Sequence, residues 1–180
     1  TGGNYAAEST IGGRRLSGEK GSMLEGGSLV PWIVNWPGHT PAGKICHDMV
    51  DSSDFLPTFA EVAGAGLPAN TVLDGQSFAS QIQGRNGKPR QSIFIQLARQ
   101  WYVREAAWKL NQDGDLFDMS RAPFEEPKVP LESTNPEAVA ARKRLQAALD
   151  KLNPAGGILD DGDGTGRRAN RESNQRKNRK

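Results

Sequence analysis

A chain of 180 residues, of which 36% are hydrophobic and 24% are charged, has the composition of one globular domain or slightly more. Its 21 glycines and 11 prolines exclude a compact helical bundle, and its single cysteine excludes an internal disulfide bond. The formal charge of +2 is unevenly placed, because residues 167–180 carry seven Lys or Arg and one Glu, a net +6, which leaves −4 for the rest.

The first part of the chain predicts a long loop followed by one strand. Residues 1–28 are rich in glycine and show little periodicity, which is typical of a loop. The segment LVPWIVNW, residues 29–36, is almost continuously apolar and stops at Pro37-Gly38. Because a strand that is apolar on both faces is usually covered on both faces, we expect a buried strand of a parallel or mixed sheet here.

A helix is predicted after the next cluster of turn residues. Ser53 or Asp54 can cap its start, and Pro57 is acceptable in a first turn. Gly64 ends the apolar pattern and suits a left-handed C-terminal cap. Four apolar side chains of this helix fall on one face: Leu56, Phe59, Val62 and Ala63.

The second half of the chain changes to short strands and a helix. Four segments between residues 92 and 119, SIFIQL, QWYVRE, AWKLNQ and LFDM, are separated by tight turns and predict an antiparallel meander. Residues 136–152 predict a helix, with Pro136 as its first residue after Asn135. Its apolar stripe is expected to be Val139, Leu145, Leu149 and Leu152. The stretch after Pro154 is rich in Gly, Asp and basic residues, and we expect it to be disordered.

Several short motifs follow one another along the chain. They are Lys20-Gly21 with Glu25-Gly26-Gly27, Val30-Pro31 with Trp36-Pro37-Gly38, DFLPT at 54–58, LDGQS at 73–77, and Val103-Arg104 with Trp108-Lys109-Leu110 before LFDMSRAPFEE at 116–126. In this order they resemble the C-terminal half of the sulfatases, the formylglycine-dependent sulfuric ester hydrolases of the alkaline-phosphatase-like superfamily. Each motif alone is short enough to occur by chance, so their order carries the resemblance.

The resemblance implies an α/β fold, namely the C-terminal part of an alkaline-phosphatase-like sulfatase fold with a small antiparallel sheet subdomain packed on a C-terminal helix. Residues 1–88 are then expected to form the end of the large sulfatase domain. Residues 89–153 are expected to form the small subdomain of antiparallel sheet and helix, and residues 154–180 a disordered basic tail.

Lys20 is the candidate substrate-binding residue. The resemblance implies that its ammonium group reaches a sulfate oxygen beside the nucleophile, where a compact charge stabilises the bound anion. The substrate would be a sulfate ester, either a small molecule or a sulfated polysaccharide. Asn4 matches the amide ligand of the family's divalent cation site, usually calcium. Gly3 stands where the family has an aspartate, so that site lacks one expected carboxylate here.

We expect no catalytic residue in this chain. The family's nucleophile is a formylglycine made from the Cys, or a Ser in its place, of a Cys-x-Pro-x-Arg motif, which Cys46 does not fit because His47 and Asp48 follow it. His39 and His47 are expected to be non-catalytic. The chain is therefore interpreted as a fragment that is inactive alone and contributes one wall of the sulfate and metal site. The resemblance implies a periplasmic or secreted enzyme, and no apolar run approaches the roughly 20 residues of a membrane span.

Two other functions stay open from the sequence. Residues 161–172, DGDGTGRRANRE, fit a calcium-binding loop pattern in which Asp161, Asp163, Thr165 and Glu172 are ligands, although an arginine occupies its eighth position. The basic tail would alternatively bind a polyanion through salt-sensitive contacts. No specific nucleic-acid binding is expected, because aromatic residues are not interleaved with the basic ones.

Overall fold

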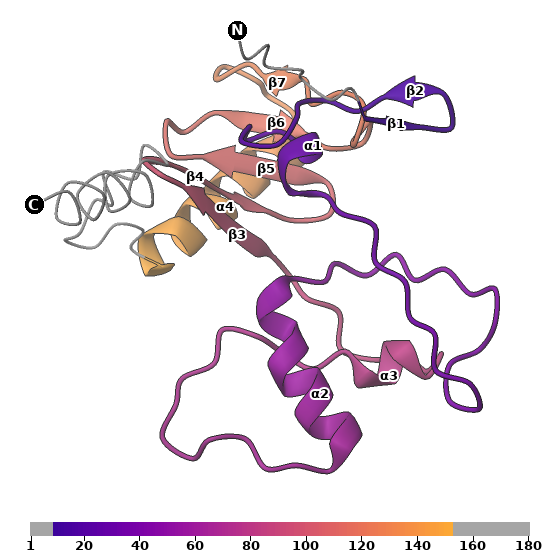
Figure 1. The fold of residues 1–180 in the computed structure, drawn as a ribbon. Helices are drawn as coiled ribbons and strands as arrows, with labels where there is room; N and C mark the ends of the chain where they lie inside the picture. The colour runs from indigo at the N-terminus through magenta and orange to yellow at the C-terminus, as the bar shows by residue number, and fades with distance from the viewer. Residues whose placement is uncertain (1–8, 153–180) are drawn as a thin grey trace, which may run out of the picture. The chain divides into compact units, whose positions relative to one another are not determined.

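The computed structural model describes residues 9–152, and the contacts among them divide this part of the chain into two compact units (Figure 1). One unit contains residues 9–29 and 94–152, and the other contains residues 30–93. Within the described range, no helix is both long enough and apolar enough to cross a membrane. The predicted domain limits at residues 88 and 153 concern the fold of a larger enzyme and stay a prediction.

A five-stranded antiparallel sheet forms the centre of the first unit. Its strands lie in sequence order: β3 (Ile93–Leu97), β4 (Gln100–Arg104), β5 (Trp108–Asn111), β6 (Leu116–Asp118) and β7 (Lys128–Val129). The register pairs Val103 with Leu110 and Leu110 with Leu116, so these three side chains share one face. The predicted meander is confirmed, because tight turns let consecutive strands pair directly.

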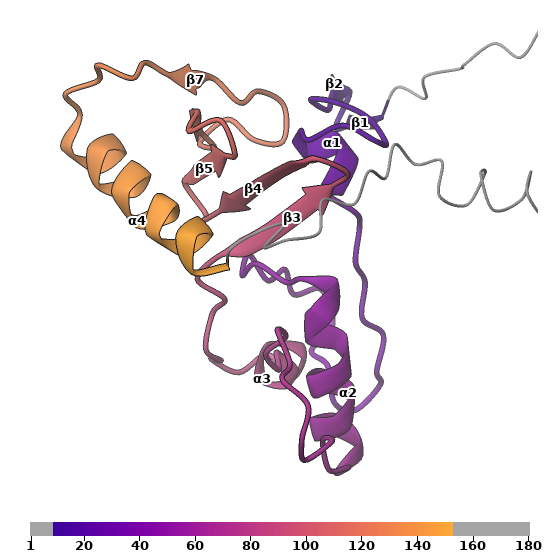
Figure 2. The same cartoon turned by 90° about the vertical axis from the view of Figure 1, so that its left-hand side faces the viewer.

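Helix α4 (Pro136–Leu152) packs on the apolar face of this sheet (Figure 2). Asn135 caps it, since its side-chain oxygen accepts a hydrogen bond from the backbone N–H of Glu137 (2.9 Å). The shared core consists of buried apolar residues from both elements: Val103, Leu110, Leu116, Ala138, Ala141, Leu145 and Leu149. The predicted helix is confirmed, and two members of its predicted stripe, Leu145 and Leu149, are buried. The other two, Val139 and Leu152, are 55% and 50% exposed, because the buried stripe begins one residue before Val139, at an alanine.

The first described residues belong to the same unit as the sheet. β1 (Thr10–Ile11) pairs with β2 (Arg14–Arg15) as a small hairpin, and after a loop the one-turn helix α1 (Glu25–Ser28) follows. The loop is tied down at its start, where the Ser17 N–H donates to the carbonyl of Pro123 (2.9 Å). Residues 9–29 are therefore mostly loop, as predicted, with contacts to the segment that follows β6.

The second unit is built around helix α2 (Phe55–Ala63), with the 3-10 turn η1 (Ser52–Asp54) before it and the short helix α3 (Ala79–Ile82) after it. The predicted helix is confirmed, and Gly64 ends it in the left-handed conformation (φ 65°). Asp54 occupies the N-cap position of α2, as one of the two predicted candidates, but its side chain makes no capping hydrogen bond there. The side-chain cap is one turn earlier, where Asp51 accepts from the Ser53 N–H at the start of η1.

Asp54 holds the second unit together. Its carboxylate accepts hydrogen bonds from the backbone N–H groups of Asp51 (2.9 Å) and Gln76 (2.8 Å) and pairs with the guanidinium of Arg90. Gly75 is needed beside it, since a Cβ there would overlap the backbone of η1. The motifs DFLPT and LDGQS thus have a structural role, because they join the long loop after α2 to the start of that helix.

Residues 29–36 do not form the predicted buried strand, and that prediction is wrong for this chain. The segment has no regular secondary structure, and Val30 and Ile33 are 73% and 86% exposed. A strand needs hydrogen-bonding neighbours, and no strand of the described residues pairs with this segment. The apolar face of α2 is similarly uncovered, since Leu56 and Phe59 are 54% and 57% exposed.

Candidate functional site

Lys20 lies exposed in a tight turn between β2 and α1. The turn is closed by Ser22, whose backbone N–H donates to the carbonyl of Glu19 (2.9 Å) and whose hydroxyl accepts from the Glu19 N–H (3.2 Å). The lysine is therefore carried by a closed turn, and its charge stays accessible to an anion in solution.

A buried ion pair anchors the chain directly after this turn. Lys109 in β5 and Glu126, beyond β6, pair with each other, and their side chains are 2% and 1% exposed. The Lys109 ammonium also donates to the carbonyl of Met23 (3.1 Å), and the Glu126 carboxylate accepts from the backbone N–H of Glu25 (2.7 Å). The loop thus obtains from side chains the hydrogen bonds that a neighbouring strand would otherwise supply.

A second buried pair adjoins the first. Glu25 is 5% exposed, and its carboxylate lies 3.0 Å from the Nε atom of Arg104 in β4. Burial raises the pKa of Glu25 above its ordinary value, and the positive charge of Arg104 opposes this shift. Ser28 and Tyr102 share a hydrogen bond of 2.9 Å between their hydroxyl groups, and burial raises the pKa of Tyr102. Both ends of α1 are therefore bonded to side chains of the sheet.

Glycine is required at two positions of α1 because the preceding loop backbone lies too close to leave room for a side chain. The Gly26 N–H donates to the carbonyl of Ser17 (2.7 Å), and a Cβ at this position would overlap the carbonyl of Gly18. A Cβ on Gly27 would overlap the carbonyl of Ser22. Side chains at either glycine would force the loop open, which explains the motif Glu25-Gly26-Gly27.

The structure places Lys20 in this loop and does not test the predicted metal ligand Asn4. Asn4 and Gly3 lie outside the described residues, as do the alternative calcium loop at 161–172 and the basic tail. In the part of the chain that the structure does describe, no group of three or more His, Cys, Asp or Glu side chains is arranged to hold a metal ion.

The cysteine and the two histidines lie in loops of the second unit. Cys46 and His47 are exposed, and His39 stacks on Trp36 with 4.0 Å between the ring centres.

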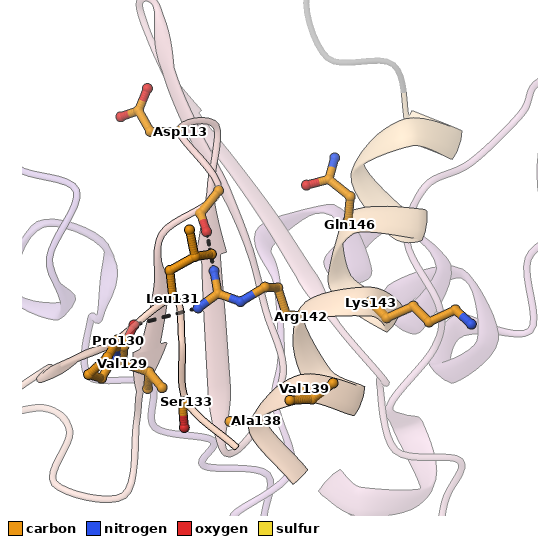
Figure 3. A pocket seen from close by; sticks show the side chains of 11 residues that line it. Asp113, Val129, Pro130, Leu131, Ser133, Ala138, Val139, Arg142, Lys143 and Gln146 are labelled. Carbon is orange, nitrogen blue, oxygen red and sulfur yellow. Dashed lines mark hydrogen bonds between the residues drawn. The ribbon is translucent and has the colours of Figure 1, made fainter. Parts of the chain in front are cut away.

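A cavity of about 490 Å³ opens between α4 and β7 in the first unit (Figure 3). Arg142 reaches from α4 into it and donates to the carbonyls of Gly114 and Val129, whereas Lys143 points away. The guanidinium is thus occupied in joining the β5–β6 turn and β7 to the helix. None of the site residues predicted from the sequence lines this cavity.

The buried charged network was not predicted from the sequence, although a signal for it was present. Lys109 stands between Trp108 and Leu110 in an apolar strand, and a lysine in such a strand requires a buried partner. Glu126 is that partner, yet 17 residues separate the two along the chain. Sequence spacing does not reveal this pairing, because it depends on how β5, β6 and the segment after them are arranged.

Comparisons with known proteins agree with the motifs. Residues 18–155 match a family model described as N-sulphoglucosamine sulphohydrolase, C-terminal. The chain is similar to arylsulfatase A of Homo sapiens, with 44% identity over 76 residues, which is 42% of this chain and 15% of that protein. It is also similar to steryl-sulfatase of Mus musculus, with 31% identity over 99 residues, covering 51% of this chain and 16% of that protein. The chain thus matches only a small part of the length of these relatives.

Proposed function

The chain belongs to the sulfatase family, of which it is a C-terminal portion, and we propose that it contributes Lys20 to the sulfate-binding wall of a sulfuric ester hydrolase. The observation that carries this proposal is the placement of Lys20 at the exposed tip of a loop whose base is buried and hydrogen-bonded to the sheet. An ordinary surface lysine needs no such base, since it is stable wherever water reaches it.

The chemistry of an ammonium group suits this role. It is a compact charge with three N–H donors, so it can bind a sulfate oxygen without a fixed planar geometry. When the S–O ester bond breaks, negative charge develops on the ester oxygen, and a positive group held beside it lowers the barrier. We propose a sulfate ester as the substrate class, either a small molecule or a sulfated polysaccharide.

We propose that the chain alone is inactive. None of its 180 residues is a Cys or Ser in a Cys-x-Pro-x-Arg or Ser-x-Pro-x-Arg sequence, so the chain supplies no formylglycine. The nucleophile would come from another part of a longer enzyme. A periplasmic or secreted location for that enzyme is part of the same proposal.

Asn4 together with residues 9–152, the part that the structure describes, does not by itself fit the family's calcium site. Calcium takes roughly six to eight oxygen ligands, with carboxylates among them. Asn4 would offer one amide oxygen, Gly3 offers no side chain, and the described residues contain no cluster of three potential ligands. We therefore derive no catalytic step from a metal and propose Asn4 only as one ligand of a site completed elsewhere.

The uncovered apolar residues support the idea that this chain works as part of a larger enzyme. Val30, Ile33, Leu56 and Phe59 are all more than half exposed. Large apolar patches on a protein surface usually mark sites that another protein segment covers. We propose that the remainder of the sulfatase packs on these residues.

The test uses a longer protein that joins this chain to the upstream part of its sulfatase, assayed with a chromogenic aryl sulfate. Lys20→Ala should lower turnover by about 10²-fold or more, because an electrostatic contact to the developing charge is lost. Lys20→Arg should restore it only in part, since a planar guanidinium does not replace a compact ammonium. Lys44→Ala, at an exposed lysine of the second unit, is the matched control and should leave turnover unchanged.

Two outcomes would contradict the proposal. Normal turnover of the Lys20→Ala protein would mean that the lysine has no role in binding sulfate. Hydrolysis by the 180-residue chain alone, above the rate of a mock purification, would mean that a nucleophile is present after all.

A further inference from the structure

We propose that the two buried ion pairs, Lys109 with Glu126 and Arg104 with Glu25, are positioning groups that hold the Lys20 turn in place, and that stabilising the sheet is not their main role. The inference rests on the proposed function of Lys20. It assigns to four charged residues a role in catalysis that operates through the loop, without contact to the substrate.

The partners of their hydrogen bonds support this role. Lys109 and Glu126 both use a buried polar atom to bind the loop backbone, at the carbonyl of Met23 and the N–H of Glu25. These backbone groups lie three and five residues after Lys20. A pair needed only to link β5 with the segment after β6 would not have to contact the loop at all.

The balance of charges allows this network to be buried. Two carboxylates face two cations, with Glu25 beside Arg104 at 3.0 Å and Glu126 against Lys109. The aromatic rings of Tyr102 and Phe117 also face the Lys109 ammonium, at 4.9 and 5.2 Å from their centres. Lys109 is therefore held from several sides. The loop carbonyl of Met23, to which it donates, is held with it.

General energetics argue against stability as the reason for these pairs. Removing two charges from water costs so much free energy that replacing a buried pair by uncharged groups of similar size is often neutral or stabilising. Removing only one partner is harmful, because an unpaired charge stays buried. A positioning role and a stabilising role therefore predict different results for a double substitution.

The experiment compares single and double substitutions in the 180-residue chain. Lys109→Met and Glu126→Gln should each lower the melting temperature strongly. Combined, they remove both charges at similar volume, and the melting temperature should return close to that of the unmodified chain. The loop should nevertheless be loosened, because the new thioether cannot donate to the carbonyl of Met23.

Loop order is measured by trypsin cleavage after Lys20, followed by mass spectrometry. Cleavage after Arg85, an exposed arginine in the second unit, is the internal reference. In the double variant, the rate at Lys20 relative to Arg85 should rise about tenfold, because local opening of the loop becomes easier. An unchanged ratio with a restored melting temperature would overturn the inference.

A second measurement needs no variant. In the unmodified chain, the amide hydrogen of Glu25 should exchange as slowly as the strand amides of β4 and β5, since its acceptor is buried. The amide of Gly21, at the exposed tip, should exchange quickly. Exchange at Glu25 as fast as at Gly21 would show that the anchor does not hold the loop and would overturn the inference.

The link to catalysis is tested in the longer protein, with the aryl sulfate used for Lys20→Ala. The double substitution Lys109→Met/Glu126→Gln should lower kcat by about 10- to 100-fold, as expected when a catalytic group is displaced. It should add little to the loss caused by Lys20→Ala, because both changes act through one lysine. If Lys20→Ala lowers turnover and the double substitution does not, the positioning inference fails while the proposed function stands. If Lys20→Ala has no effect, the proposed function itself fails.

Discussion

Asp54→Asn should destabilise the second unit by about 3 kcal/mol. The Asp54 side chain is 2% exposed and accepts hydrogen bonds from the backbone N–H groups of Asp51 and Gln76 and from Arg90. The asparagine side chain has the same shape, but its NH2 group is a hydrogen-bond donor and would face one of the N–H groups that the carboxylate now accepts from. The substitution also leaves Arg90 without its counter-charge. Breaking a buried pair costs about 3–5 kcal/mol, and the 15% exposure of the Arg90 side chain favours the lower end, because water recovers part of the loss.

The assay is urea-dependent hydrogen exchange of the α2 amides, measured by mass spectrometry, because it reports on this unit separately from the sheet. Asp74→Asn, at an exposed carboxylate in the same unit, is the matched control and should change stability by less than about 0.5 kcal/mol. If Asp54→Asn were as stable as this control, the assignment of Asp54 as the centre of the unit would be refuted.

The pH dependence gives an independent check on the same carboxylate. Burial alone would raise the pKa of Asp54, but hydrogen bonds from Arg90 and from the backbone of Asp51 and Gln76 outweigh it, so the pKa lies below its ordinary 3.8. A lowered pKa in the folded state contributes stability that is present above the ordinary pKa and lost as the pH falls through the lowered one. The stability difference between the unmodified chain and Asp54→Asn should therefore shrink below about pH 4, and a constant difference would contradict the mechanism.

Three further substitutions test other parts of the first unit. Leu145→Ala should lower the free energy of unfolding by about 2–5 kcal/mol in urea titration, since Leu145 is 1% exposed in the core, whereas Val139→Ala at an exposed helix position should cost less than about 0.5 kcal/mol. Asn135→Ala should cost about 1 kcal/mol by the same measurement, because the N-cap of α4 is lost. Gly27→Ala should speed trypsin cleavage after Lys20, since a Cβ there would overlap the carbonyl of Ser22; an unchanged cleavage rate would show that the loop tolerates a side chain.

Local signals in the sequence were sufficient for several elements. The helix at 136–152 follows from Pro136 as first residue after Asn135 and from an apolar stripe that includes Leu145 and Leu149, all of which act within a few turns of the chain. The meander follows from alternating strands and tight turns, which pair neighbours in sequence. The order of the short motifs was likewise enough to indicate the family, because order is a property of the chain alone.

Residues 29–36 show where local signals fail. Their apolar, β-branched sequence favours a buried strand, but burial and pairing require other strands, and the described residues supply none for this segment. The cap of η1 shows the same limit on a smaller scale. Asp51, Ser53 and Asp54 are all good capping residues by type. Asp54 completes the capping box with Asp51 and also binds Arg90 and Gln76, which come 36 and 22 residues later.

The glycine-rich sequence around Lys20 is enough to place that residue in a loop. That Lys109, Glu126 and Arg104 meet at the base of this loop follows from the fold and not from any local pattern. The register of β4 and β5 pairs Arg104 with Lys109, and Glu126, which lies between β6 and β7, reaches Lys109 only through the path of that connection. A lysine in an apolar strand signals that a buried partner must exist, and only the fold selects Glu126 as that partner and brings both to the backbone that carries Lys20.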